Sequence, residues 1–312
     1  MLGNCQVQAI SKILEYALKS IEDFRIEYIL VYLDDIDEDN YSDFNRTLLE
    51  ADWVFTQEVS DNYRQSNIFS TSRVKTLRSE TVILPNFFLQ VEHPMLGCLW
   101  DGSKTISPDS SEYCCLLMVS LYLMDLSIDE AANLYISQIP SLWKEFLKIS
   151  LASLAEAQRR EKNWFFQTSD LYLKNLGKRQ IFNTYNHPKE WVLLLAAEKV
   201  IKFILSEEQN KMFAALNNLH SASSGCELTS LNQLSYRPLN SVMAANGLCQ
   251  QVYQGQNYFR FGTNVMCEQN YIETWFNFFD NSFDREKIVN LLKSSSVNLD
   301  KIKSVTHALA AR

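Results

Sequence analysis

The sequence Met1-Leu2-Gly3-Asn4-Cys5-Gln6-Val7-Gln8-Ala9-Ile10 opens the chain and decides how we interpret its fold. Gly3 and Asn4 tolerate tight or left-handed backbone and stand directly before a helical pattern. The apolar residues of that pattern recur at the spacing of one helix face, at Ile10, Ile13, Leu14, Ala17, Leu18 and Ile21. We therefore predict that Cys5 lies at a helix N-terminus, where backbone N–H groups and the macrodipole favour a thiolate. The alternative is a small buried side chain that fills the turn.

Length and composition are those of an ordinary globular protein. The chain has 312 residues, 46% of them hydrophobic and 21% charged, which suits one large domain or two ordinary ones. A formal net charge of −8 argues against a partner such as nucleic acid, which needs a basic face. No apolar run reaches membrane-spanning length and the first residues lack a signal-peptide pattern, so we expect a cytoplasmic protein without an integral membrane segment. The oligomeric state is left open.

The cysteines do not indicate a disulfide framework or a metal site. Their number is odd and their spacing irregular, with cysteines at 5, 98, 114, 115, 226, 249 and 267. Because no Cys-x-x-Cys pair is present, we expect no structural zinc, and the acidic run 34–39 is predicted to be a solvated loop. Cys114 and Cys115 are predicted to be core residues of an apolar helix over 111–124.

Strands that alternate with helices predict a parallel α/β sheet in the first part of the chain. Strands are expected over 24–33, 52–57 and 81–85. Only Met1 and Leu2 precede Gly3, which leaves little sequence for a strand before Cys5. Ligands of such sheets bind beyond the carboxyl ends of the strands, and Gln57 and Asn86 occupy those positions.

From residue 107 the pattern becomes mainly helical. Ser127-Ile128-Asp129-Glu130 is a capping box that opens a helix to about residue 137. Further helices are expected over 141–162, 188–205 and 270–279. The fold class is therefore α/β, with a parallel-sheet core followed by a large helical portion. The predicted divisions are an α/β core over 1–106, a mainly helical portion that completes the site over 107–281, and a C-terminal tail helix over 282–312.

A cysteine nucleophile needs a base, and the chain has four histidines. His93 and His187 each precede a proline in a predicted loop, where functional residues concentrate, although a role in a turn or cap is about as plausible. His220, in a polar loop, and His307, in the tail, are set aside.

His187 is the first choice of base. Pro188 is expected in the first turn of the following helix and would fix the loop, and Asn186 beside His187 can orient its ring. His93 is the second choice, with Glu92 as its orienting carboxylate only if the chain turns back.

Several short segments occur in a distinctive order. They are Gly-Asn-Cys-Gln at 3–6, Gln57 with Asp61-Asn62-Tyr63-Arg64, Pro85-Asn86-Phe87-Phe88 with His93-Pro94, Arg179-Gln180-Ile181-Phe182 with Asn186-His187-Pro188, Arg237-Pro238-Leu239, and Tyr258-Phe259-Arg260-Phe261. Together they resemble the WcbI-like polysaccharide biosynthesis acetyltransferases over roughly residues 1 to 275. The resemblance implies transfer of an acetyl or other acyl group from coenzyme A to a carbohydrate acceptor, a sugar of a surface polysaccharide such as a capsule.

That chemistry assigns a role to each predicted site residue. Cys5 either takes the acyl group or shapes the thioester pocket, with His187 or His93 as general base. One hydrogen-bond donor to the oxyanion of the tetrahedral intermediate typically stabilises the transition state by about 3 kcal/mol. The oxyanion and substrate contacts are assigned to the turn around Cys5 and to the sheet edge, at Asn4, Gln6, Gln57, Asn86 and Asn186. The coenzyme A contacts are assigned to Gly3, Arg64, Arg73 and Arg179.

Two other classes of function stay open. A cysteine-dependent esterase or thioesterase uses the same nucleophile, base and oxyanion donors with water as the acceptor. A non-catalytic carbohydrate- or nucleotide-binding protein keeps the pocket without needing Cys5 and a histidine to meet. A dinucleotide-dependent oxidoreductase is disfavoured, because no Gly-x-Gly-x-x-Gly follows a predicted strand.

Overall fold

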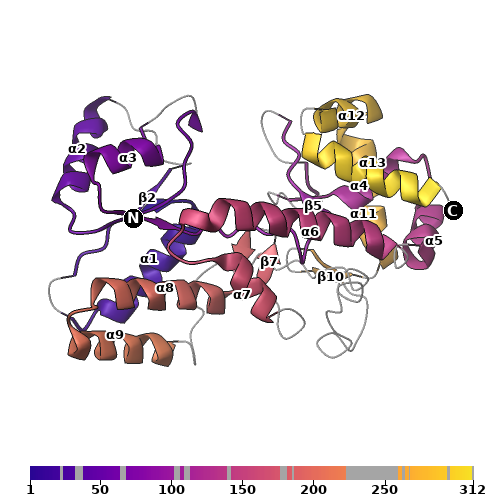
Figure 1. The fold of residues 1–312 in the computed structure, drawn as a ribbon. Coiled ribbons are helices and arrows are strands. Elements are labelled where there is room, and N and C mark those ends of the chain that lie inside the picture. Colours follow the sequence, from indigo (N-terminus) through magenta and orange to yellow (C-terminus); the bar gives the residue numbers. More distant parts are fainter. Residues whose placement is uncertain are drawn as a thin grey trace. The chain divides into compact units, whose positions relative to one another are not determined.

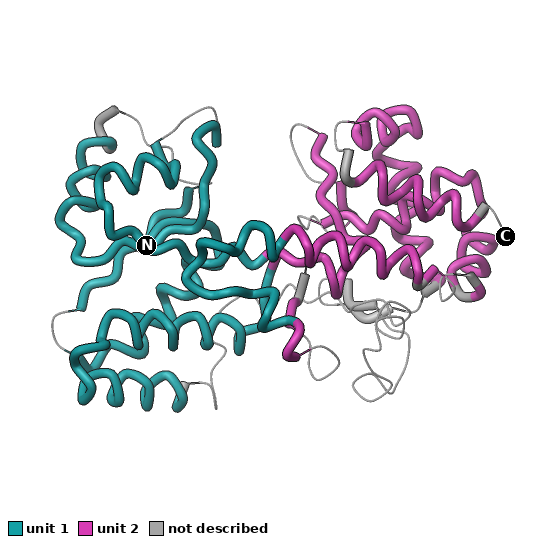
Figure 2. Tube along the Cα trace, in the orientation of Figure 1, with its two compact units in different colours: residues 1–87, 157–172, 187–232 teal, residues 88–156, 173–186, 233–312 magenta. Residues whose placement is uncertain are grey.

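The computed structural model divides the chain into two compact units (Figure 2). The structure describes residues 1–21, 24–31, 38–63, 68–101, 106–108, 113–138, 142–175, 181–184, 186–222, 259–261, 264–266, 268–293 and 296–310. Unit 1 comprises residues 1–87, 157–172 and 187–232, and unit 2 comprises residues 88–156, 173–186 and 233–312. The units do not follow the predicted divisions after residues 106 and 281, because helices from the middle of the chain return to pack on the first helix.

Unit 1 is built on a four-stranded parallel sheet. Its strands are β1 (Leu2–Gly3), β2 (Ile29–Leu30), β3 (Val54–Gln57) and β4 (Thr81–Leu84). Their spatial order is β2-β1-β3-β4, with every neighbouring pair parallel. The predicted parallel sheet is confirmed, and the short β1 lies inside it. The predicted strand over 24–33 shortens to two residues, because β1 offers only Leu2 and Gly3 as ladder partners.

The strand order creates a topological switch point between β1 and β3. From β1 the chain passes to its neighbour β2 and then crosses to β3 on the other side. Open α/β sheets bind their ligands in the crevice beyond the carboxyl ends of the strands at such a point. Cys5 follows β1 after one residue, and Glu58 follows β3 directly. The topology therefore brings the ends of β1 and β3 to the place where ligands are expected.

Helices form two groups around this sheet (Figure 1). The first group is α1 (Cys5–Leu18), α8 (Glu190–Ile204) and α9 (Gln209–Ala222), which pack on one another. The second group is α2 (Glu38–Glu50) and α3 (Thr71–Leu77), whose apolar side chains pack against β1 and β3. The predicted apolar face of α1 is confirmed, since Ile10 and Ile13 are completely buried.

The helix predicted over 188–205 begins later than expected. Pro188 belongs to β8 (His187–Pro188), and α8 starts at Glu190. Val192, in the first turn of α8, is buried, whereas Phe203, near its end, is 41% exposed. The Phe203 ring instead packs edge-on against Phe55, with ring centroids 5.9 Å apart.

Unit 2 is mainly helical, as predicted for the later part of the chain. Its helices are α4 (Leu116–Leu123), α5 (Ile128–Gln138), α11 (Glu268–Ser282), α12 (Arg285–Lys293) and α13 (Ser296–Ala310). Its short strands are β5 (Leu96–Gly97), β6 (Cys114–Cys115), β7 (Phe182–Thr184), β9 (Phe259–Phe261) and β10 (Asn264–Met266). Two helices, α6 (Trp143–Arg160) and α7 (Thr168–Asn175), contain residues of both units, and a short 3-10 helix, η3 (Glu161–Asn163), follows α6. The predicted capping box is confirmed by the reciprocal hydrogen bonds between Ser127 and Glu130.

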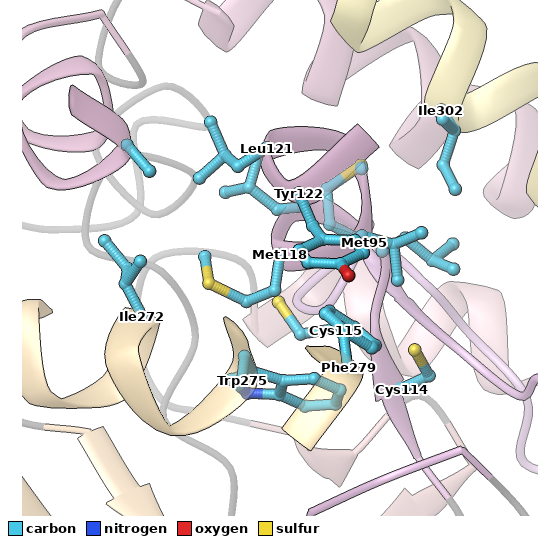
Figure 3. Packing of buried hydrophobic residues seen from close by; sticks show 14 of the residues in the cluster. Met95, Cys114, Cys115, Met118, Leu121, Tyr122, Ile272, Trp275, Phe279 and Ile302 are labelled. Carbon is cyan, nitrogen blue, oxygen red and sulfur yellow. The ribbon is translucent and has the colours of Figure 1, made fainter. Parts of the chain in front are cut away.

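Aromatic residues of α11 and side chains of α4 form the core of unit 2 (Figure 3). Trp275 and Phe279 are both completely buried, and their ring centroids lie 5.5 Å apart. Cys114 and Cys115 are core residues as predicted, but they form a strand that pairs with Leu96–Gly97 instead of a helical turn. The predicted single tail helix is wrong as well, because α12 and α13 are separate helices that each bury an apolar face in this core.

Candidate active site

Cys5 is the first residue of α1, and the preceding residue fixes its position. The backbone of Asn4 is extended, and its side chain accepts a hydrogen bond from Gln6 N at 2.9 Å, which makes Asn4 the N-cap. An N-cap of this kind stabilises the first turn by about 1 kcal/mol. Cys5 therefore lies at the positive end of the helix macrodipole, which favours its thiolate, as the sequence predicted.

His187 contacts Cys5 directly. Its Nε2 lies 3.3 Å from Cys5 Sγ, and both residues belong to unit 1. The imidazole is only 3% exposed, and this burial lowers the pKa of His187 from 6.5 to about 4. The ring is therefore neutral near pH 7. With its proton on Nδ1, a neutral ring accepts a proton at Nε2, which faces the thiol.

Two buried glutamine side chains attach the Cys5 turn to the sheet. Gln57 Oε1 accepts the Asn4 N–H at 2.9 Å, while Gln57 Nε2 donates to Gln6 Oε1 at 2.8 Å and to Pro85 O at 3.0 Å. Gln6 Nε2 donates to Phe87 O at 2.9 Å, and Gln6 Oε1 accepts from Phe87 N at 3.0 Å. Because these amides are occupied inside the protein, their contacts do not fit the oxyanion roles that the sequence suggested for Gln6 and Gln57.

Gly3 is required by the close approach of these side chains. A Cβ atom at Gly3 would lie 2.5 Å from Gln57 Oε1 and still closer to Val7 Cγ2. Real Cβ atoms do not approach other atoms so closely, so a side chain here displaces Gln57 or α1. This packing role differs from the coenzyme A contact that the sequence suggested for Gly3.

The second predicted histidine lies in unit 2. His93 is 5% exposed, and its Nε2 is 3.5 Å from Phe182 O. The neighbouring Glu92 is 1% exposed and accepts the backbone N–H groups of Ile181 and Phe182 at 3.0 and 2.7 Å. Glu92 thus holds the segment that leads into β7, a structural use that the sequence did not reveal.

Asn186 is anchored by a buried tyrosine. Its Oδ1 accepts a hydrogen bond from Tyr113 OH at 2.5 Å, and Tyr113 is 1% exposed. This bond fixes the backbone directly before His187 in the chain. The predicted effect of Asn186 on the orientation of the His187 ring stays a prediction. Nothing in the sequence around Tyr113 marks it as a residue of the site.

Arg73 is the one described residue of the three arginines predicted to hold cofactor phosphates, since Arg64 and Arg179 lie outside the described residues. Its guanidinium lies 4.9 Å from the centroid of the Tyr41 ring. Its Nε is buried and has no hydrogen-bond partner among the described residues. A buried donor without a partner is rare in proteins and suits an anionic ligand.

Two further properties bear on the class of site. Among the described residues, no three His, Cys, Asp or Glu side chains are grouped closely enough to hold a metal ion. Within the same part of the chain, no helix has both the length and the apolar character that crossing a bilayer requires. The chemistry of the Cys5–His187 pair is consistent with either a nucleophile with its base or a thioester-binding cysteine.

Comparison with known proteins identifies one family and one related structure. The family described as "Polysaccharide biosynthesis enzyme WcbI" matches residues 1–208, which include both Cys5 and His187. The chain also resembles a solved structure of WcbI, described as a novel polysaccharide biosynthesis enzyme, native and without a disulfide bond between coenzyme A and a cysteine. The two structures superpose with a TM-score of 0.75 at 15% sequence identity. The match covers 99% of this chain and 97% of the WcbI chain. At that identity the likeness shows the fold alone. None of the curated proteins compared with the chain matches it.

Proposed function

The chain belongs to the WcbI family of polysaccharide biosynthesis enzymes, and we propose that it transfers an acetyl or other acyl group from coenzyme A to a sugar hydroxyl. The observation that carries this proposal is the 3.3 Å contact between Cys5 Sγ and His187 Nε2 at the sheet's switch point. Membership of the family indicates polysaccharide biosynthesis. The contact between Cys5 and His187 suits a nucleophile with its general base, which acyl transfer uses. The mention of coenzyme A in the description of the related WcbI structure supports coenzyme A as the donor.

In the first half of the proposed reaction, Cys5 accepts the acyl group. His187 Nε2 takes the thiol proton, and Cys5 Sγ forms a bond to the acyl carbon. The bond between the acyl carbon and the sulfur of coenzyme A breaks, and His187 returns the proton to that departing sulfur. The neutral state of the buried His187 ring lets it act as the base near pH 7.

In the second half, His187 activates the acceptor. Its Nε2 takes the proton of the sugar hydroxyl while the hydroxyl oxygen bonds to the acyl carbon held on Cys5. The bond to Cys5 Sγ breaks, and His187 gives the proton back to that sulfur. A direct route also uses this geometry, with His187 activating the sugar while Cys5 lines the thioester site, so both routes require His187.

The residues present fit coenzyme A at two points. Cys5 and His187 suit its thioester end. The Nε of Arg73, which has no hydrogen-bond partner in the described part of the chain, suits a phosphate oxygen. Coenzyme A supplies the activated acyl group. Asn4 at the turn and Asn86 beyond β4 are the proposed contacts to the reacting atoms and to the acceptor.

Mass spectrometry of the intact protein after incubation with acetyl-coenzyme A tests the proposal. We expect a mass increase of one acetyl group that maps to Cys5 and is absent in Cys5→Ala. Cys98→Ala removes an exposed cysteine and is the matched control, which keeps the adduct. Failure of the folded wild-type protein to bind coenzyme A in calorimetry contradicts the proposal. Release of acetate at the same rate with and without sugars identifies a thioesterase instead.

A further inference from the structure

A cavity of about 500 Å³ opens in unit 1 at the carboxyl end of β3 and β4. Residues that directly follow β3 form one wall, and Asn86, two residues beyond β4, lies on another. Thr71, the first residue of α3, also lines it. The volume falls in the usual range for small-molecule sites. The carboxyl edge of an open parallel sheet is where such ligands bind.

Hydrogen bonds connect this cavity to the Cys5 turn. Thr71 Oγ1 accepts the Val59 N–H at 2.9 Å and donates to Gln57 O at 3.4 Å. Gln57 is the residue whose side chain holds Asn4, directly before Cys5. The cavity and the proposed nucleophile therefore share one structural support, although Cys5 itself does not line the cavity.

The described residues of the lining include equal numbers of acidic and basic side chains. The acidic ones are Glu58 and Asp61, and the basic ones are Lys75 and Arg160. A coenzyme with several phosphates is repelled by the two carboxylates, and these four described side chains together carry no net positive charge to attract it. A neutral polyol suits this set, because each sugar hydroxyl both donates to a carboxylate and accepts from an amine, guanidinium or amide.

The two carboxylates are held in position by neighbouring side chains. Trp164 Nε1 donates to Glu58 Oε2 at 3.3 Å, and Ser72 Oγ donates to Asp61 Oδ1. Fixed acceptors lose less conformational entropy on binding than freely rotating ones, which favours recognition of hydroxyl groups in a set geometry.

We propose that this cavity binds the sugar that bears the acceptor hydroxyl. The inference rests on the proposed acyl transfer and names the place of the second substrate. Glu58 and Asp61 accept hydrogen bonds from sugar hydroxyls, and Asn86, Lys75 and Arg160 donate to them. The reacting hydroxyl then extends from this site toward the Cys5 turn.

Saturation-transfer NMR on the full chain tests the inference, with the methyl glycosides of glucose, galactose, mannose and N-acetylglucosamine as probes. Glu58→Gln keeps the size of the side chain and removes its charge. Glu50→Gln is the matched control, because Glu50 is an exposed residue of α2 that lines a different cavity. We expect at least one glycoside to bind the wild type and Glu50→Gln equally, and to bind Glu58→Gln at least tenfold more weakly.

Calorimetry with coenzyme A separates this inference from the proposed function. We expect the three proteins to bind coenzyme A within twofold of one another. The inference is overturned if no glycoside binds, if Glu58→Gln binds the glycoside as well as the wild type, or if Glu58→Gln loses coenzyme A instead. Failure of the wild type to bind coenzyme A, with glycoside binding still dependent on Glu58, refutes the acyl transfer from coenzyme A and leaves a sugar-binding cavity.

Discussion

Replacement of His187 by glutamine is expected to remove a pH-dependent loss of stability. The buried ring has a pKa of about 4 in the folded protein against 6.5 when it is exposed. Below pH 6.5 the unfolded chain therefore binds a proton that the folded chain does not. Protonation then favours unfolding, and stability falls as the pH decreases from about 6.5 to about 4.

The size of this effect follows from the two pKa values. Because one pKa unit corresponds to about 1.4 kcal/mol, the loss relative to neutral pH is about 2 kcal/mol at pH 5 and about 3 kcal/mol at pH 4. Glutamine has no titrating group in this range. His187→Gln should therefore show a smaller drop in the free energy of unfolding between pH 7.5 and pH 5, by about 2 kcal/mol.

Urea unfolding of the wild type and of His187→Gln at pH 7.5 and pH 5 measures the drop in the free energy of unfolding for each protein. The difference between the two proteins cancels the contribution of every other titrating group. His220→Gln, which changes an exposed histidine of α9, is the control and keeps the wild-type pH dependence. Equal drops in the wild type and His187→Gln would falsify the argument, as would an NMR titration in which His187 gains its proton near pH 6.5.

Three further outcomes are expected. Cys5→Ala and His187→Ala should each lower the rate of acyl transfer by a similar large factor. The double variant should lower it by little more, because the effects of residues that act as a unit are non-additive. Losses that multiply in the double variant, measured in steady-state assays, would show that Cys5 and His187 do not act together. Gln57→Leu removes the partners of Asn4 N, Gln6 Oε1 and Pro85 O and should lower the free energy of unfolding by about 3 kcal/mol or more, whereas Gln209→Leu on the exposed start of α9 should change it by less than about 0.5 kcal/mol. Coenzyme A affinity should fall with added salt in calorimetry, because charge-assisted phosphate contacts are screened; an affinity independent of salt argues against phosphate binding by arginine.

The parts of the fold that the sequence predicts are those with a repeated pattern. Ile10 and Ile13 mark the buried face of α1, and the run 54–57 is a buried strand because four successive residues are shielded on both faces. The strand over 24–33 could not be bounded in this way, because its length depends on the partner beside it. Cys114 and Cys115 illustrate the same limit, since their apolar surroundings suit a helix and only the pairing with Leu96 and Gly97 makes them a strand.

The sequence predicts the reactive side chains of the candidate site, but not the side chains that hold them in position. A cysteine before a helical pattern and a histidine before a proline are visible in the sequence, and the structure brings Cys5 and His187 to 3.3 Å. The sequence shows that Gln6 and Gln57 are polar and lie near the turn. It does not show that both are buried and hydrogen-bonded inside the protein, where their contacts hold the turn in place.

These glutamines also explain how a strand of two residues can position a reactive thiol. The β1 ladder alone supplies few hydrogen bonds to hold the turn, with Leu2 and Gly3 as its whole length. Gln57 adds a bond to Asn4, and the Gln6 side chain adds two to Phe87, so the turn is held from β3 and from the segment after β4. Buried hydrogen bonds that are fully satisfied rigidify a structure. The position of Cys5 relative to His187 therefore depends on side-chain amides as much as on the sheet. Substitutions at Gln57 should accordingly reduce acyl transfer even where Cys5 and His187 are unchanged.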